Sequence, residues 1–343
     1  MNPYSNTKPY QRWSSAVGDR YFTEIDWTLE KRFEISKVDK TISLGSCFAQ
    51  HIARSLLQNG YNYLFASESA AQAETRTFSA RYGNVYSVRQ ARQLLERAFG
   101  VSDFPLSTES WLSHSGKIID PFRPNEFPNG FDSDDEMLDE RRKHLDNVRE
   151  IFSSADVIIF TLGLTETWLD IKSGAVLPVA PGVYGGPWPS ANYQFTNFSY
   201  SDCESDLREF AAIIKRINPR ARIILTVSPV SLVATMENQS VAISTCHSKS
   251  VLRAVAGEFA RLNANAFYFP SYEIITNPAA GGLFYEDNYR EVTQAGVATV
   301  MQAFYIALNN KLTERKFRSE DAIYRSYRPE CDEEVIKTLL DND

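Results

Sequence analysis

The sequence predicts a doubly wound α/β sandwich, in which helices cover both faces of a mostly parallel sheet. Four short apolar runs carry this prediction, at residues 41–44, 156–162, 221–227 and 266–269. Runs that are apolar on both faces are typical of strands covered on both sides, as in a parallel sheet. Helical patterns lie between these runs, and the alternation of strands with helices indicates the doubly wound architecture.

The elements follow in order along the chain. Residues 1–36 show no clear period and are expected to form an extended N-terminal arm. The run 41–44 is the first strand, and residues 61–66 are a candidate second strand. Between them, residues 47–60 have apolar side chains at helical spacing and end at Gly60, as helices often end at glycine.

The remaining helices are recognised by apolar residues at helical spacing. They are predicted over residues 88–99, 138–153, 205–217, 249–263 and 293–309. Together with the strands they form a single α/β domain over residues 37–310, and residues 311–343 follow it as a C-terminal tail.

Two long segments, at about 103–136 and about 170–200, fit no regular element and are predicted to be irregular insertions. Long insertions in a compact domain are uncommon and often form binding loops. The second segment contains VAPGVYGGPWPSANYQF, in which aromatic residues alternate with Gly, Pro and Asn. Its aromatic faces suit stacking on sugar rings; in the alternative interpretation they pack only against one another.

Composition and charge disfavour several classes of protein. The chain has 343 residues, of which 43% are apolar, and a formal net charge of −7. This length and apolar content suit a globular protein of one large domain or two smaller ones. The acidic balance disfavours general binding to nucleic acid or to anionic membranes, because those partners require a basic surface.

The sequence also bears on localisation and on metals. No stretch approaches the roughly 18 apolar residues of a membrane span, and the first residues, MNPYSNTKPYQRW, lack the apolar segment of a signal peptide. We therefore expect a cytoplasmic protein without a membrane span, in a compartment where disulfides are rare. No metal site is expected, because no metal-ligand spacing occurs among Cys47, Cys203, Cys246 and Cys331.

Chemically useful residues follow several of the predicted strands. Ser46 and Cys47 follow the first strand, and Glu166 and Trp168 follow the strand at 156–162. Ligands of a doubly wound sheet bind beyond the carboxyl ends of its strands. We therefore expect these side chains to converge at one edge of the sheet.

Ser46 and Cys47 also precede a helix, whose dipole and free N–H groups favour an anion and lower the pKa of a thiol. Cysteine is the better nucleophile near neutral pH, because part of it is thiolate. The alternative interpretation is structural: Cys47 is a small buried residue and Ser46 is a helix N-cap.

A nucleophile normally needs a general base, most often a histidine. The chain has four histidines, His51, His114, His144 and His247. His51 lies one helical turn after Cys47 and shares its face of the helix, so it either approaches the thiol or simply packs there. His144 lies in a charged helix and is predicted to be a solvated surface group.

Seven motifs, in order along the chain, resemble the GSCFA-domain family. They are GSCFA at 45–49, RYGNVY at 81–86, DPFRPN at 120–125, TLGLTETW at 161–168, TVSPV at 226–230, SKSVLR at 248–253 and FPSYEI at 269–274. The family is grouped with the SGNH (GDSL-like) hydrolases, which cleave or transfer acyl esters, often acetyl groups on carbohydrates. The resemblance therefore implies a flavodoxin-like three-layer sandwich around a central, mostly parallel sheet.

The resemblance also implies roles for individual residues. The first block of SGNH hydrolases, Gly-Asp-Ser, aligns with GSC at 45–47, which places Cys47 rather than Ser46 at the position of the nucleophile. The second block supplies a glycine to the oxyanion hole, and Gly83, followed by Asn84, matches it.

The third block, Gly-x-Asn-Asp, aligns with GLTE at 163–166. Gly163 is thereby a candidate member of the oxyanion hole. The asparagine of the block is missing here, so Glu166 or Asn84 is expected to take over its role.

The fourth block, Asp-x-x-His, supplies the orienting acid and the base of SGNH hydrolases. It aligns with Asn288 and Glu291, or in another register with Asp287 and Arg290, and neither register restores a histidine. The standard triad is therefore not intact in this sequence.

The missing histidine leaves three hypotheses. In the first, the base comes from elsewhere, from His247, His51 or His114. In the second, Glu291 is itself the base, provided that burial raises its pKa toward neutrality. In the third, the site binds an acyl or sugar ligand without turning it over.

The leading functional hypothesis is an acyl-ester hydrolase or O-acyltransferase that acts on an acylated carbohydrate or a related small substrate. Cys47 attacks the acyl carbon, while its own N–H, the Gly83 N–H and the Asn84 side chain hold the oxyanion. Glu166 or Glu291 orients the base or the substrate hydroxyl. No cofactor is expected, and a coenzyme A thioester is the candidate acyl donor.

Three further residues are candidates for substrate binding. Arg81 and Arg123 are expected to hold an anionic substrate, or in the structural alternative to form buried ion pairs, and Trp168 is expected to contact the substrate. The alternative function is a non-catalytic glycan- or acyl-ligand-binding protein associated with polysaccharide synthesis. No dinucleotide- or phosphate-binding motif is present, and the sequence leaves the oligomeric state open.

Overall fold

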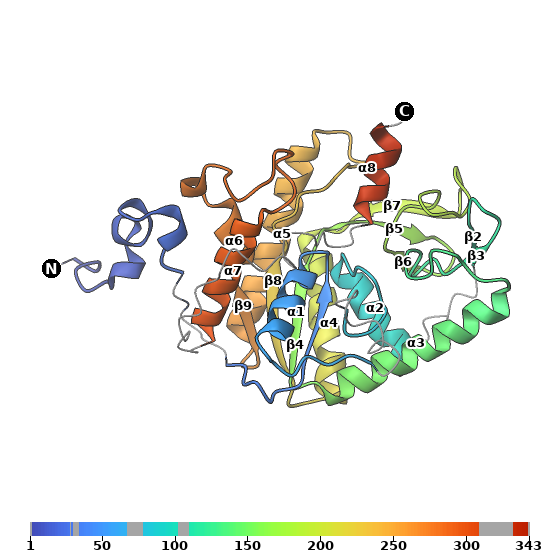
Figure 1. The fold of residues 1–343 in the computed structure, drawn as a ribbon, viewed down its shortest axis with the longest axis horizontal. Helices are drawn as coiled ribbons and strands as arrows, with labels where there is room; N and C mark the ends of the chain where they lie inside the picture. Colours follow the sequence, from blue (N-terminus) through green and yellow to red (C-terminus); the bar gives the residue numbers. More distant parts are fainter. Residues whose placement is uncertain are drawn as a thin grey trace. The chain divides into compact units, whose positions relative to one another are not determined.

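The protein is built around a parallel β-sheet. In the computed structural model, which describes residues 2–27, 29, 34–66, 78–101, 110–308 and 332–341, its strands lie in the order β1-β4-β8-β9 (Figure 1). They are β1 (Thr41–Gly45), β4 (Val157–Leu162), β8 (Arg222–Val227) and β9 (Ala266–Phe269). Both β1 and β8 pair in parallel with β4. These strands confirm the predicted apolar runs.

The strand order is that of the flavodoxin-like fold. Tyr63 forms a single parallel bridge with Thr41 on the free side of β1, and the strand predicted over 61–66 is reduced to this bridge. The chain therefore moves first toward Tyr63 and later in the opposite direction across the sheet. Because crossovers between parallel strands are right-handed, α1 (Ala49–Gln58) covers one face of the sheet. The same rule places α4 (Tyr200–Ile217) and α5 (Val241–Leu262) on the other face.

Capping residues set the ends of the helices. The first turn of α2 (Val88–Phe99) is capped by Ser87, and the helix ends at Gly100, which has a left-handed conformation. Ser133 caps α3 (Asp134–Ser154) in the same way. Both α4 and α5 begin earlier than predicted, because Ser199 and Ser240 cap turns that carry few large apolar side chains.

The two insertions are more regular than predicted. The first contains the hairpin of β2 (Trp111–Leu112) and β3 (Ile118–Ile119), and its residues 103–109 lie outside the described residues. The second belongs to an antiparallel sheet of β5 (Glu166–Asp170), β6 (Val176–Leu177) and β7 (Tyr193–Asn197). The prediction of irregular structure was wrong for these segments, because β2, β3 and β6 have only two residues each and β7 has no buried residue that would mark a period.

The insertions pack on each other through a small core of their own. Its buried residues are Trp111, Ile119 and Phe122 from the first insertion and Ala175, Leu177 and Val179 from the second. We call residues 110–131 and 166–197 the insertion lobe. Two segments that are far apart in the sequence are thus held together by apolar burial rather than by either segment alone.

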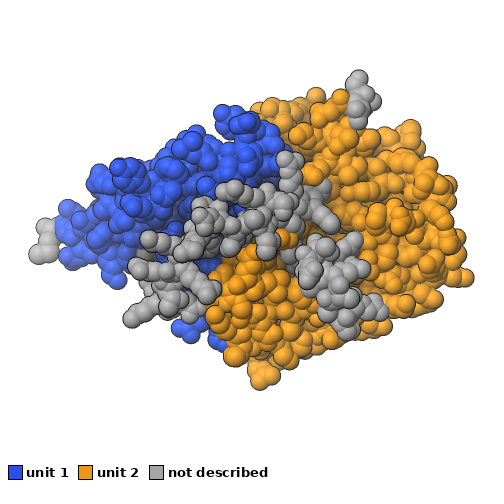
Figure 2. All heavy atoms as spheres, in the orientation of Figure 1, with its two compact units in different colours: residues 1–36, 229–231, 269–328 blue, residues 37–228, 232–268, 329–343 orange. Residues whose placement is uncertain are grey.

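Contacts between residues divide the chain into two compact units (Figure 2). One comprises residues 37–228, 232–268 and 329–343, and the other comprises 1–36, 229–231 and 269–328. The first contains most of the sheet, the insertion lobe and α8 (Glu333–Asp341). Residues 311–331 of the predicted tail lie outside the described residues.

The second unit contains the N-terminal residues, which do not form the extended arm that was predicted. They fold into three short helical turns, η1 (Pro9–Gln11), η2 (Ser14–Gly18) and η3 (Phe22–Glu24). The Phe22 ring packs edge-on against Phe284, with 5.3 Å between centroids, so these residues are tied into the unit by aromatic contacts. The unit also contains α6 (Ser271–Thr276), η5 (Pro278–Ala280) and α7 (Gln294–Ala307). Among the described helices, none combines the length and the apolar character that crossing a membrane requires.

Candidate functional site

The turn after β1 carries the predicted nucleophiles. Gly45 has φ of 137°, and a Cβ atom at this position would lie 2.2 Å from the Thr161 carbonyl oxygen, so only glycine fits. The next N–H group, that of Ser46, donates to the same Thr161 carbonyl at 3.1 Å. The side chains of Ser46 and Cys47 are consequently buried between the end of β1 and the start of α1.

The loop of residues 82–86 docks on this turn. Its Val85 N–H donates to the Gly45 carbonyl at 2.8 Å, and its Tyr86 carbonyl accepts the Gly163 N–H at 2.9 Å. A Cβ atom on Gly163 would come within 3.2 Å of the Ser46 Cβ, so the ends of β1 and β4 are closely packed here. The oxyanion role predicted for Gly163 requires its bond to Tyr86 to break.

Two polar groups around the turn are available for a ligand. The Ser46 Oγ is buried and has no hydrogen-bond partner among the described residues. Gly83 has φ of 64°, and no acceptor in the described part of the chain takes its N–H. Buried polar groups are normally satisfied in folded proteins, so unused donors at the edge of a sheet are suited to bind a substrate.

Asp332 reaches this loop from the C-terminal segment, and sequence reasoning missed it. Its carboxylate accepts hydrogen bonds from the side chains of Asn84 at 3.0 Å, Tyr86 at 3.2 Å, Asn125 at 2.5 Å and Tyr184 at 3.1 Å. Burial raises the pKa of Asp332 to about 6, although the hydrogen bonds from its neighbours oppose the shift. No local pattern in the acidic sequence around it indicated this position.

Lys249 and Ser248 were quoted in a motif but not recognised as site residues. The Ser248 Oγ accepts the Thr165 N–H at 2.9 Å, and the Lys249 Nζ donates to the Gly163 carbonyl at 2.5 Å. Both side chains are buried. They anchor α5 to the GLTE segment, whose Gly163 packs closely against Ser46.

Glu166 lies at the start of β5, on the side of the sheet where the turn lies. Its carboxylate accepts a hydrogen bond from the Thr235 hydroxyl at 2.7 Å, and burial raises its pKa. Trp168, two residues further along β5, packs edge-on against Trp188 with 5.1 Å between ring centroids. It also lies against the core of the insertion lobe, as the alternative interpretation of the aromatic segment proposed.

Of the three candidate histidine bases, one is buried and two are exposed. His51 is buried against Phe48, and its pKa is lowered to about 4 by burial and by Arg54. It is therefore neutral near pH 7 and a weak base. His247 and His114 are exposed, on α5 and in the insertion lobe.

The prediction that His144 is a solvated surface group was wrong. It is buried, and its pKa is lowered well below the ordinary value by burial and by four arginines, Arg123 first. The signal was present in the sequence, because the buried residues of α3 repeat at helical spacing. They are Met137, Arg141, His144, Leu145, Val148, Ile151 and Phe152.

The two predicted anion holders form ion pairs. Arg81 lies 3.5 Å from the Glu126 carboxylate and stacks on Phe127, and Arg123 lies 3.3 Å from the Asp120 carboxylate. Both contacts agree with the structural alternative for these residues. Among the described residues, no group of three acidic, histidine or cysteine side chains is placed to hold a metal ion.

Glu291 and Asn288 belong to the compact unit that does not contain Cys47. The Asn288 amide donates to the Glu291 carboxylate at 3.1 Å, so the two residues predicted to replace the acid and the base do contact each other. A catalytic role for this pair stays a prediction.

Comparisons with known proteins identify one family. The model of the GSCFA family matches residues 40–304. No curated protein matches the chain. A solved carbohydrate esterase family 2 enzyme with a carbohydrate binding domain, from Corynascus thermopiles (Myceliophthora fergusii), is 16% identical with a TM-score of 0.26; the match covers 46% of this chain and 38% of that chain. A putative GDSL-like lipase from Parabacteroides merdae is 15% identical with a TM-score of 0.29, over 51% of this chain and 67% of that chain.

Proposed function

Because the chain belongs to the GSCFA family, we propose that it is an SGNH-type acyl-ester hydrolase or O-acyltransferase acting on an acylated carbohydrate or a similar small substrate. One observation carries this proposal: the Ser46–Cys47 turn is buried at the carboxyl end of β1, against the loop of residues 82–86. Ligands of this fold bind at that edge. The turn therefore presents a nucleophile where a substrate is expected.

In the proposed reaction, the Cys47 thiol passes its proton to a base while its sulfur attacks the acyl carbon. The carbonyl oxygen becomes an oxyanion, for which the Gly83 N–H and the Asn84 amide are the donors. The ester C–O bond then breaks, and the departing alkoxide takes the proton from the base. Water or an acceptor hydroxyl finally attacks the thioester and releases the thiol.

We assign the role of base to Asp332. Its hydrogen bond with Asn84 connects it to the proposed oxyanion donors, and four side-chain donors fix its orientation. A carboxylate with a pKa of about 6 is ionised at pH 7 and more basic than an ordinary aspartate, which suits a general base. Glu166, whose pKa is also raised by burial, is the second choice.

The same contacts support a non-catalytic alternative. Four donors surround the Asp332 carboxylate as they would surround a bound acidic ligand. In addition, His51 is a weak base and His247 and His114 are exposed. A protein of this kind binds a glycan or acyl ligand at the same edge without turning it over.

Activity measurements on variants separate the two functions. We expect wild-type protein to hydrolyse p-nitrophenyl acetate, or to transfer acetyl from acetyl-coenzyme A to sugar acceptors, and Cys47→Ala to abolish this turnover. The matched control is Cys203→Ala, since Cys203 is a buried cysteine on α4 whose pKa is raised to about 12. Loss of turnover in Ser46→Ala but not in Cys47→Ala would identify Ser46 as the nucleophile. Binding of glycan without turnover in wild type would contradict the enzyme and support the alternative.

A further inference from the structure

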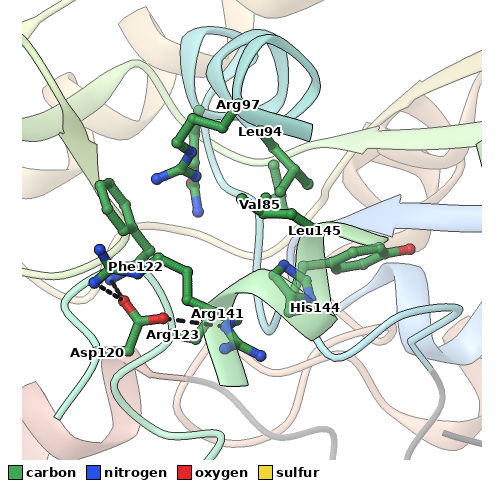
Figure 3. A pocket seen from close by; sticks show the side chains of 11 residues that line it. Val85, Leu94, Arg97, Asp120, Phe122, Arg123, Arg141, His144 and Leu145 are labelled. Atoms are coloured by element: carbon green, nitrogen blue, oxygen red, sulfur yellow. Dashed lines mark hydrogen bonds and ion pairs between the residues drawn. The ribbon is translucent and has the colours of Figure 1, made fainter. Parts of the chain in front are cut away.

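A cluster of arginines surrounds a small cavity beside the loop of residues 82–86. Arg97 extends from α2, Arg141 from α3, and Arg123 from the DPFRPN segment (Figure 3). The cavity has a volume of about 20 Å³, and its other walls include Val85, Leu94, Phe122, His144 and Leu145. Three guanidinium groups therefore line one small space together with apolar side chains.

Three arginines and one carboxylate, that of Asp120, line this cavity. Asp120 pairs with Arg123 at 3.3 Å and with Arg141 at 2.8 Å, as the dashed lines in Figure 3 show. Arg97 lies over the face of Phe122 at 3.7 Å, and in the described part of the chain no carboxylate forms an ion pair with it. Burying a charge without a partner is costly, so this arrangement calls for a counter-ion.

The carboxylates just outside the lining form ion pairs with other arginines. Burial lowers the pKa of Arg123, and the nearby Glu126 and Glu140, which oppose this shift, both form ion pairs with Arg81. Glu96, the neighbour of Arg97, pairs with Arg92. Within the lining itself, Asp120 is the carboxylate that opposes the three guanidinium groups.

Two of the arginines that line the cavity have a guanidinium donor with no acceptor among the described residues. The Arg97 Nε and the Arg123 Nη2 are buried without hydrogen-bond partners among the described residues, and the same holds for the His144 Nδ1. The pKa of Arg97 is lowered to about 9 by burial and by Arg141, which shows how unfavourable its charge is there. His144 is neutral, because burial and the arginines hold its pKa down, so its ring can donate one hydrogen bond.

We propose that this cavity is a binding site for one monovalent halide-sized anion, such as chloride, held by Arg97 and Arg123. A single water molecule needs about 10 to 15 Å³, so a space of about 20 Å³ admits a monatomic ion. A lining of three guanidinium groups and one carboxylate favours an anion. The bound ion would contact side chains from α2, α3 and the DPFRPN segment, next to the loop that carries Gly83 and Asn84.

Thermal unfolding in defined salts tests the proposal. We expect a saturable rise in Tm when sodium gluconate is replaced by sodium chloride or bromide at constant ionic strength. Arg97→Met, which keeps the apolar stem, is expected to lose this rise. Arg142→Gln, on the same α3 as Arg141 but with 70% of its side chain exposed, is expected to keep it.

Crystals grown in sodium bromide locate the ion directly and do not depend on a variant that folds. We expect an anomalous peak between Arg97 and Arg123. Equal Tm values in gluconate and halide, no peak at this position, or stabilisation by phosphate but not by halide would each overturn the proposal. None of these results depends on enzyme activity, so the proposed function is tested separately.

Discussion

Asp332 and His144 show how burial changes the chemistry of a single residue. Asp332 is surrounded by polar donors and carries a raised pKa of about 6, whereas His144 is surrounded by arginines and carries a lowered pKa. In both cases burial is the first cause, because it disfavours the charged form of either group. The two residues therefore respond to pH in opposite senses, and each response is measurable.

Replacing Asp332 by asparagine is expected to remove the proposed base. In wild type, kcat/KM should rise with pH through about 6 and then level off, because the carboxylate must be ionised to accept a proton. In Asp332→Asn we expect a loss of roughly 100- to 10,000-fold and no rise near pH 6. A matched control is Asp341→Asn, in α8 beyond the hydrogen-bonded cluster. An unchanged pH profile in Asp332→Asn would exclude Asp332 as the base.

His144 is expected to make folding less stable in acid. Its pKa in the folded protein lies below the unfolded value of 6.5, so its contribution to stability is present above pH 6.5 and is lost as pH falls below it. The loss is about 1.4 kcal/mol for each pH unit in that window. Urea unfolding of wild type and His144→Gln at pH 5 and pH 7 measures it. Parallel curves for the two proteins would show that His144 is not buried in its neutral form.

At the scale of elements, the sheet and the helices were predictable, but the insertion lobe was not. Strands such as β4 are buried along their whole length, so each reads as a continuous apolar run. The helix α2 has the bounds that its apolar spacing predicted, 88–99. In contrast, β2, β3 and β6 each have two residues, and their core is shared between two distant segments. No local pattern encodes such a core.

Replacing Gly45 by alanine tests the contact between β1 and β4. The new Cβ at position 45 would overlap the Thr161 backbone. A Cβ at Gly60, which also has a positive φ, would meet no atom within 4 Å. We expect Gly60→Ala to cost about 1 kcal/mol, the price of the strained backbone. Gly45→Ala should cost more than about 3 kcal/mol or prevent folding. Similar urea midpoints for the two variants would contradict the close approach.

Replacing Trp111 by alanine tests the core of the insertion lobe. Trp111 is 1% exposed, and its indole N–H donates to the Tyr193 hydroxyl at 2.9 Å. We expect Trp111→Ala to lower the free energy of unfolding by about 3 to 5 kcal/mol. Trp188→Ala, at a tryptophan that is 53% exposed, should cost much less. Comparable losses in urea unfolding would show that the lobe has no packed core.

At the scale of the whole molecule, the candidate site combines predictable and unpredictable parts. The Ser46–Cys47 turn was predicted from its place after an apolar strand, and the Gly83–Asn84 segment was predicted from its resemblance to a family motif. Asp332 was not, because it contacts Asn84 across 248 residues of sequence. Contacts at such separations depend on the folded path of the chain, which hydrophobic periodicity does not reveal.

We therefore expect the C-terminal segment to contribute one functional carboxylate, that of Asp332, and little to the stability of the fold. The described residues of α8 include none that is buried, so removing the helix should cost little stability. A chain that ends after Glu334 keeps Asp332 and should retain most of its turnover. A chain that ends after Cys331 leaves Asn84, Tyr86 and Tyr184 without their acceptor and should lose as much kcat/KM as Asp332→Asn. Equal activity of the two truncated chains, measured with p-nitrophenyl acetate, would show that Asp332 has no role in catalysis.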